Sequence, residues 1–123
     1  MRDHTSLRVW QEAHAVTVDV IRLCKTSWKP YASAVFGQLQ RSSLSVQLNI
    51  VEGYTFGDSP TFTKHLGIAY GSAVETGELL RLAAETGVLE EELVRPLLLR
   101  TQNTEHMLLA LLKQRRKFKS QRS

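Results

Sequence analysis

The sequence predicts an all-α protein, an antiparallel up-and-down four-helix bundle that assembles into a cyclic homo-oligomer. Three observations lead to this fold class. Apolar residues recur at spacings of three and four over long stretches, and no segment shows the alternation of a half-buried strand. Only three prolines and seven glycines interrupt the 123 residues. Because the connections between periodic stretches are short, about three to eight residues, consecutive helices should run antiparallel.

The four helices are expected in one domain, because a chain of 123 residues can bury a single core. Their expected ranges are 6–26, 32–52, 59–86 and 89–117, so residues 1–117 form the bundle and a basic tail follows at 118–123. Pro96 lies inside the last range. A proline there removes one backbone hydrogen bond and clashes one turn back, which predicts either a kink or a restart of the helix.

Capping and helix-breaking residues set these ranges. Ser6 is the expected N-cap of the first helix, and Gly53 is suited to the left-handed conformation that ends the second. Asp58 or Ser59 can cap the third helix, with Pro60 in its first turn.

The composition is that of a soluble globular protein, with 42% hydrophobic and 23% charged residues. No apolar run approaches the roughly 20 residues that span a bilayer, and the start, MRDHTSLRVW, lacks an apolar signal core. We therefore expect a bacterial-type cytoplasmic protein. The single cysteine, Cys24, cannot form an internal disulfide and is expected to be a small buried hydrophobe.

Positive charge is concentrated in two segments of a chain whose formal net charge is +4. From Lys113 onward there are six basic residues and no acid, and residues 20–51 hold four basic residues without a carboxylate. If the two segments meet in the fold, one face becomes positive and can bind phosphates with little sequence preference. Alternatively, the terminal cations only complement the helix dipole and keep the chain end soluble. The candidate nucleic-acid-binding residues are Arg22, Lys25, Lys29, Lys113, Arg115, Arg116, Lys117, Lys119 and Arg122, with Phe118 as a possible stacking residue.

The second helix shows two apolar faces separated by polar residues. Its core stripe contains Phe36, Leu39, Ser43, Val46 and Ile50. The polar seam, expected on the far side of the helix, contains Arg41, Ser42, Ser45, Asn49 and Glu52. These residues are either a solvated helix end or part of a buried network that includes Glu75, in which Arg41 could pair with Glu52 or Glu75.

The third helix also has apolar residues outside its core stripe. Surplus apolar surface on two helices predicts self-association, unless the fourth helix, the loops or the tail cover it. The candidate interface residues are Leu44, Leu48, Val51, Ile68, Leu79 and Leu82.

Three segments resemble the four-helix-bundle proteins encoded in intervening sequences of large-subunit ribosomal RNA genes. They are LRVWQEAHAVTVDVIRL, LQRSSLSVQLNIVEGY and FTKHLGIAYGSAVETGELL. The resemblance covers about residues 7–112 and includes the pattern R-x-x-x-S-[IV]-x-x-N-I-x-E-G. It implies a small helical bacterial protein that forms a pentameric ring with a nucleic-acid-binding role. The chain is also similar to accessory proteins of diversity-generating retroelements, which present a positive surface to RNA and DNA.

No catalytic motif is recognisable. A carboxylate-bridged metal centre in a bundle requires Glu-x-x-His on two helices, and neither that spacing, a P-loop, GxSxG nor a dinucleotide fingerprint occurs. We expect no catalysis, no metal and no cofactor. The principal hypothesis is a ring-forming nucleic-acid-binding module. The alternatives are a scaffold for a protein partner and a helix-turn-helix regulator, although the second helix is too apolar to lie in a groove.

Overall fold

The computed structural model describes residues 3–122, with side chains described up to Lys117. Within that range the chain forms four α-helices and two short 3-10 helices, and no strand. The elements in order are η1 (His4–Ser6), α1 (Arg8–Ser27), η2 (Pro30–Ala32), α2 (Ser33–Tyr54), α3 (Pro60–Glu85) and α4 (Glu91–Arg122).

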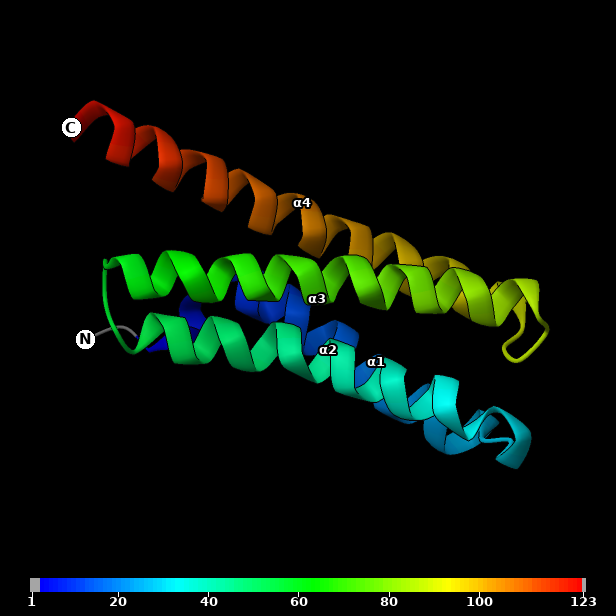
Figure 1. Cartoon of the computed structure of the whole chain (residues 1–123). Coiled ribbons are helices and arrows are strands. Elements are labelled where there is room, and N and C mark those ends of the chain that lie inside the picture. The colour runs from blue at the N-terminus through cyan, green and yellow to red at the C-terminus, as the bar shows by residue number, and fades with distance from the viewer. Residues whose placement is uncertain (1–2, 123) are drawn as a thin grey trace.

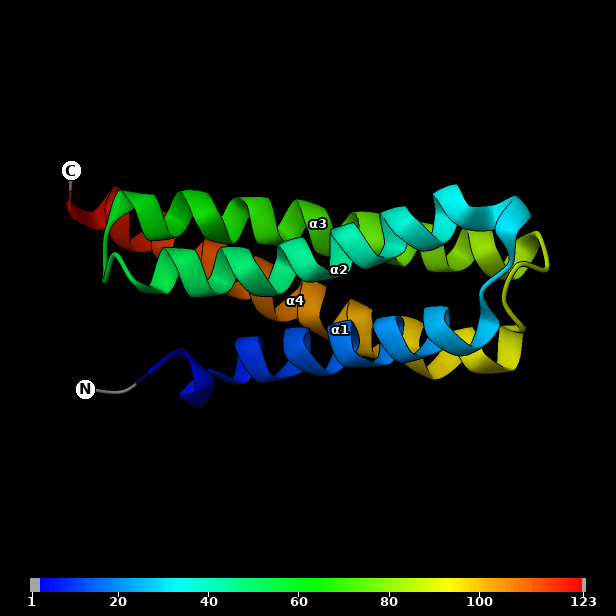
Figure 2. The same cartoon turned by 90° about the horizontal axis from the view of Figure 1, so that it is seen from below.

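The helices run up and down, and both chain ends lie at the same end of the bundle (Figure 1). Figure 2 shows that α4 crosses the bundle obliquely, beginning beside α1 and ending beside α3. The all-α four-helix fold is thereby confirmed, and assembly into a ring stays a prediction.

The helix starts follow the capping chemistry in one case and depart from it in another. Ser59 caps α3, since its hydroxyl accepts a hydrogen bond from the backbone N–H of Phe62 at 3.3 Å, and Pro60 is the first helical residue. Ser6 does not cap α1. It lies in η1, and Leu7 occupies the N-cap position without a side-chain hydrogen bond. The reason is that Asp3 caps this short 3-10 turn first.

Gly53 does not end α2, because the helix continues to Tyr54 and Gly53 is buried within it. A Cβ atom at Gly53 would lie 2.8 Å from the Cβ of His65 and 2.9 Å from Cδ1 of Phe62. Glycine is therefore required by the close approach of α2 and α3. The left-handed backbone conformation belongs to Gly57 in the following turn, with a φ of 67°.

The last helix begins at Glu91, two residues later than expected, and neither restarts at Pro96 nor gives way to a tail at residue 118. Pro96 stands close to the start of α4 and is exposed, so its missing N–H affects only the first turns. The segment 97–122 contains no glycine or proline, and its many Leu, Lys, Arg and Gln residues are strong helix formers.

The core consists of two apolar clusters joined by a layer of buried hydroxyl groups. One cluster, which includes Phe36 and Leu80, lies toward the α1–α2 and α3–α4 connections. The other, which includes Ile50 and Leu108, lies toward the chain ends. Most of the hydroxyl groups between them donate hydrogen bonds to backbone carbonyls. For example, Thr101 donates to the Leu97 carbonyl at 2.8 Å. The buried polar residues are Thr17, Ser42, Ser43, Thr76, Thr101 and Thr104.

Candidate nucleic-acid interface

The uncharged residues of the polar seam of α2 face α3, so the expectation that the seam lies on the far side is wrong for them, whereas Arg41 and Glu52 are exposed. Thr76 donates a hydrogen bond to the Ser42 hydroxyl at 2.8 Å, and the hydroxyls of Ser45 and Ser72 lie 2.8 Å apart. Asn49 bonds Ser45 on its own helix, and its side-chain oxygen lies 2.9 Å from Nδ1 of His65. Small hydroxyl side chains allow the two helices to approach closely while the polar groups find partners across the contact.

The charged members of the predicted network fall into two separate groups. Glu52 lies 3.7 Å from Nδ1 of His65 at the end of the seam. Arg41 donates to Gln38 at 3.2 and 3.1 Å, and Gln38 in turn donates to Glu75 at 3.0 Å. Gln38 therefore bridges Arg41 and Glu75, which do not pair directly. It can do so because it lies one turn from Arg41 on α2 and faces α3. These contacts tie the Gln38 side chain to α3, whereas Arg41 is exposed and bonds a residue of its own helix.

Four of the six candidate interface residues are substantially exposed. The exposed fractions are 41% for Leu44, 44% for Leu48, 43% for Ile68 and 46% for Leu82. Neither α4 nor the loops cover these side chains in one protomer. Val51 is half-buried.

Leu79 does not belong to this exposed set. It is half-buried and packs against the core cluster that contains Phe36. Helical spacing placed Leu79 beside Leu82, but the side of α3 that carries Leu79 turns toward the core.

The cations Arg22, Lys25 and Lys29 lie at the opposite end of the bundle from Lys113 and the residues after it, so these two groups do not form one positive face within a protomer. Lys29 donates its ammonium N–H to the Val88 carbonyl at 2.7 Å, in the connection between α3 and α4. Arg22 lines a shallow hollow with Arg100 of α4. Lys113 lies 13 residues beyond Arg100, or roughly 20 Å along the helix. That separation exceeds the physiological Debye length of about 8 Å, so the two groups act independently.

The last described turns of α4 carry cations of two kinds. Lys113, Arg116 and Lys117 are exposed and share one side of the helix at spacings of three and four residues. Arg115 is only 20% exposed and points the other way, into contacts with the start of α3. Lys119 and Arg122 lie where only the backbone is described, so their side chains, like that of Phe118, fall outside the described residues.

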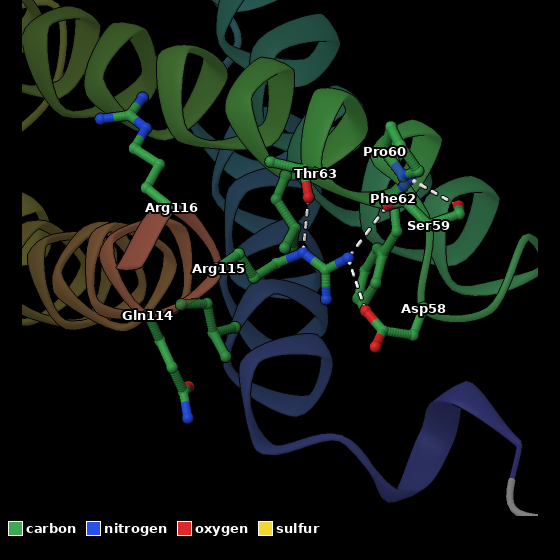
Figure 3. Close-up of a pocket in the computed structure, with 10 residues that line it drawn as sticks. Asp58, Ser59, Pro60, Phe62, Thr63, Gln114, Arg115 and Arg116 are labelled. Atoms are coloured by element: carbon green, nitrogen blue, oxygen red, sulfur yellow. Dashed lines mark hydrogen bonds and ion pairs between the residues drawn. The ribbon is translucent and has the colours of Figure 1, made fainter. Parts of the chain in front are cut away.

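Arg115 is anchored by groups from the turn before α3 and from its first turns. Its Nη2 lies 2.8 Å from the carboxylate of Asp58 and donates to the Ser59 carbonyl at 2.9 Å. Its Nε donates to the Thr63 hydroxyl at 2.6 Å, and the guanidinium carbon lies 4.7 Å from the centre of the Phe62 ring. Figure 3 shows the side chain crossing from α4 to these groups, while Arg116 and Gln114 point away from them. Arg115 is thus held by contacts within the chain, and its candidate role in nucleic-acid binding stays a prediction.

A pocket of about 680 Å³ lies beside Arg115, between the start of α3 and the end of α4. Its walls are mostly apolar, and its polar lining comes from the Arg115 contacts and from two residues of α4 (Figure 3). The lining residues are Asp58, Ser59, Pro60, Phe62, Thr63, Leu66, Leu111, Gln114, Arg115 and Arg116. Sequence patterns do not indicate this pocket, since Asp58 and Arg115 are 57 residues apart.

Exposed aromatic side chains form a second feature that was not predicted from the sequence. Tyr31 is 78% exposed in η2, and Phe56 is 58% exposed in the turn after α2. Phe56 stacks on His65 with 6.2 Å between ring centres. Their exposure depends on where the helix connections leave the bundle, which periodicity does not indicate.

Among the described side chains, no group of three or more His, Cys, Asp or Glu residues could hold a metal ion. No helix in the described part of the chain is long and apolar enough to cross a membrane.

Comparison with known proteins agrees with the resemblance seen in the sequence. The family model described as 23S rRNA-intervening sequence protein matches residues 5–110, which confirms that recognition. No match is found among curated proteins. A crystal structure of a protein of unknown function from the S23 ribosomal protein family of Bacteroides thetaiotaomicron has a similar fold, with a TM-score of 0.79. The two are 23% identical, and the match covers 85% of this chain and 98% of the other.

Proposed function

Because the chain belongs to the 23S rRNA-intervening sequence protein family, we propose that it is a non-enzymatic nucleic-acid-binding protein that works as a cyclic homo-oligomer. The observation that supports this proposal most is the stripe of Lys113, Arg116 and Lys117 on the outer side of α4. No acid follows Lys113 in the sequence. The stripe can contact phosphates of RNA or DNA, with little preference for base sequence.

The strength of such binding follows from counterion release. Three phosphate contacts on a single strand give a salt slope of about −2, so affinity should fall roughly 20-fold between 50 and 200 mM salt. An oligomer presents several stripes together, which makes both the affinity and its salt dependence larger. A pentamer, which the family resemblance implies, would offer five stripes.

The matched basic pairs at the two ends of the bundle provide the test. Lys113→Gln/Arg116→Gln and Arg22→Gln/Lys25→Gln each remove two exposed charges spaced three residues apart on a helix. Fluorescence anisotropy with a labelled RNA should show weaker binding and a smaller salt slope for the α4 pair, and little change for the α1 pair. Equal losses in both variants, or an affinity that does not respond to salt, would reject the α4 stripe as the binding surface.

Self-association is proposed to use the exposed apolar residues Leu44 and Leu48 of α2 with Ile68 and Leu82 of α3. Leu48→Ser should shift the oligomer toward smaller species, because it removes apolar surface from the contact. Leu99→Ser is the matched control, since Leu99 is an exposed leucine on α4. Light scattering that gives the mass of one chain for the unmodified protein at micromolar concentration would refute the oligomer.

The same apolar residues favour a second candidate function, a scaffold that binds a protein partner. The two functions differ in what they need. A scaffold keeps its protein partner when Lys113 and Arg116 are neutralised, whereas nucleic-acid binding is weakened by that change.

A further inference from the structure

The pocket between α3 and α4 has the size and lining of a small-molecule site. Its volume of about 680 Å³ lies within the range typical of ligand pockets, which are mostly apolar with a few polar groups. Pro60, Phe62 and Leu111 supply apolar walls above the buried Leu66, and Gln114 and Arg116 supply polar groups at the α4 side. An occupant should therefore combine a flat or compact apolar body with polar edges.

Arg115 makes one wall of this pocket suitable for a planar ring. Three of its contacts use donors in the plane of the guanidinium, and the Phe62 ring lies 4.7 Å from its central carbon. The side chain is held in one orientation by these contacts. The Phe62 ring covers one face of the guanidinium, which leaves the opposite face for stacking, and bases stack on guanidinium planes in many RNA complexes.

The positive charge around the pocket indicates which chemical group the planar ring of an occupant is attached to. Arg116 lines the pocket and is exposed, and Lys113 and Lys117 lie beside it on the same helix. These cations complement an anion, so the occupant that fits both features is a base joined to a phosphate. An apolar side chain from a second copy of the chain would use the walls but would leave this charge unmatched.

Building on the proposed function, we infer that the pocket accepts an unpaired nucleobase of the bound strand while Arg116 and its neighbours hold the adjoining phosphates. Single-stranded or looped RNA or DNA is then the preferred substrate, because a base inside a duplex cannot enter the pocket. Phosphate contact alone would not distinguish these forms in this way.

The test compares three labelled RNAs of equal length: a single strand, the same strand with abasic sites, and a duplex. The intact strand should bind about tenfold more tightly than the abasic strand, the effect expected for one stacked base. Leu111→Ala should reduce that ratio toward one and leave duplex binding unchanged. Leu99→Ala, on an exposed part of α4 away from the pocket, should leave the ratio unaltered.

A second measurement does not depend on any variant. In a chain with labelled leucine methyl groups, adenosine monophosphate should shift the methyl signals of Leu66 and Leu111 and leave those of Leu44 and Leu48 in place. Ribose 5-phosphate, which lacks the base, should produce no such shift. Shifts confined to leucines outside the pocket would overturn the inference.

The outcomes separate this inference from the proposed function. Equal affinity for the intact and abasic strands, with salt-dependent binding of both, would overturn the base pocket and retain the phosphate stripe. Absence of binding to all three RNAs would reject the proposed nucleic-acid binding and this inference with it, and shifts by adenosine monophosphate would then show a nucleotide pocket that serves no bound strand. Leu111 signals that move with protein concentration alone would show that a second copy occupies the pocket, which overturns the inference.

Discussion

Replacing Gly53 with alanine tests the close approach of α2 and α3 directly. The added Cβ would lie 2.8 Å from the Cβ of His65 and 2.9 Å from the Phe62 ring. The Cβ of His65 is fixed to the α3 backbone and cannot turn away as a flexible side-chain end could. The helices must therefore move apart near Gly53, which also loosens the contact between Asn49 and His65.

The magnitude follows from two opposing effects. Overpacking a close contact destabilises by about 1–3 kcal/mol, and the higher helix propensity of alanine stabilises by about 1 kcal/mol. Because a backbone-attached atom must shift, we expect overpacking at the upper end of its range, about 2–3 kcal/mol, and so a net loss of about 1–2 kcal/mol. For a chain of this length, that corresponds to a fall in Tm of roughly 4–8 °C.

Gly67→Ala is the matched control, because Gly67 is also helical but has no atom within 4 Å of its Cβ position. It should gain about 0.5–1 kcal/mol from propensity alone. Urea denaturation followed by circular dichroism, at one protein concentration for all variants, measures both changes. If Gly53→Ala is as stable as Gly67→Ala, the inferred contact between α2 and α3 is wrong.

Three further predictions follow from buried and surface groups. Burial raises the pKa of the Cys24 thiol to about 11, so only roughly a thousandth of it is thiolate at pH 8. A thiol reagent should therefore label the native chain negligibly at that pH and label one group per chain in denaturant. Rapid labelling of the native chain would contradict the burial of Cys24. Thr76→Val removes the hydrogen bond between α3 and Ser42 of α2 and should lower the free energy of unfolding by about 1 kcal/mol. Thr101→Val should change it by less, because the Thr101 hydroxyl bonds a carbonyl of its own helix. Chemical denaturation that ranks the two variants in the reverse order would refute this role of the hydroxyl layer. Arg100→Ala removes half-exposed ion pairs with Glu12 and Asp19 and should lower the free energy of unfolding by less than about 1 kcal/mol. The difference from the unmodified chain should shrink in 1 M salt. A larger loss that does not change with salt would contradict a screened surface contact.

Periodicity predicted much of the core because a helix that packs on one side must bury residues at spacings of three and four. The core stripe expected for α2, from Phe36 through Ser43 to Ile50, is buried throughout. The direction of the polar seam could not be obtained in the same way. Two apolar faces separated by polar residues fit either a solvent-facing or a helix-facing seam, and only the position of α3 distinguishes them.

The candidate site was predictable in its charge and not in its arrangement. The absence of acid after Lys113 is visible in the sequence, and it led to Lys113, Arg116 and Lys117, which are exposed. Arg115 has the same chemistry as Arg116, yet it is anchored to Asp58. Neighbouring residues on a helix point about 100° apart, so one of two adjacent arginines can face the bundle while the other faces solvent.

The sequence by itself determined that this chain is a set of amphipathic helices with surplus apolar surface on α2 and α3 and a cationic end on α4, because spacing and composition are properties of each segment alone. Only the tertiary structure decided that the two groups of candidate phosphate-binding cations lie at opposite ends of the bundle, that Gly53 serves helix contact, and that Arg115 joins α4 to the start of α3. Those outcomes depend on which helices become neighbours and in what register. Local propensity does not carry that information, because contacts between segments far apart in sequence are fixed by the packing of the whole core.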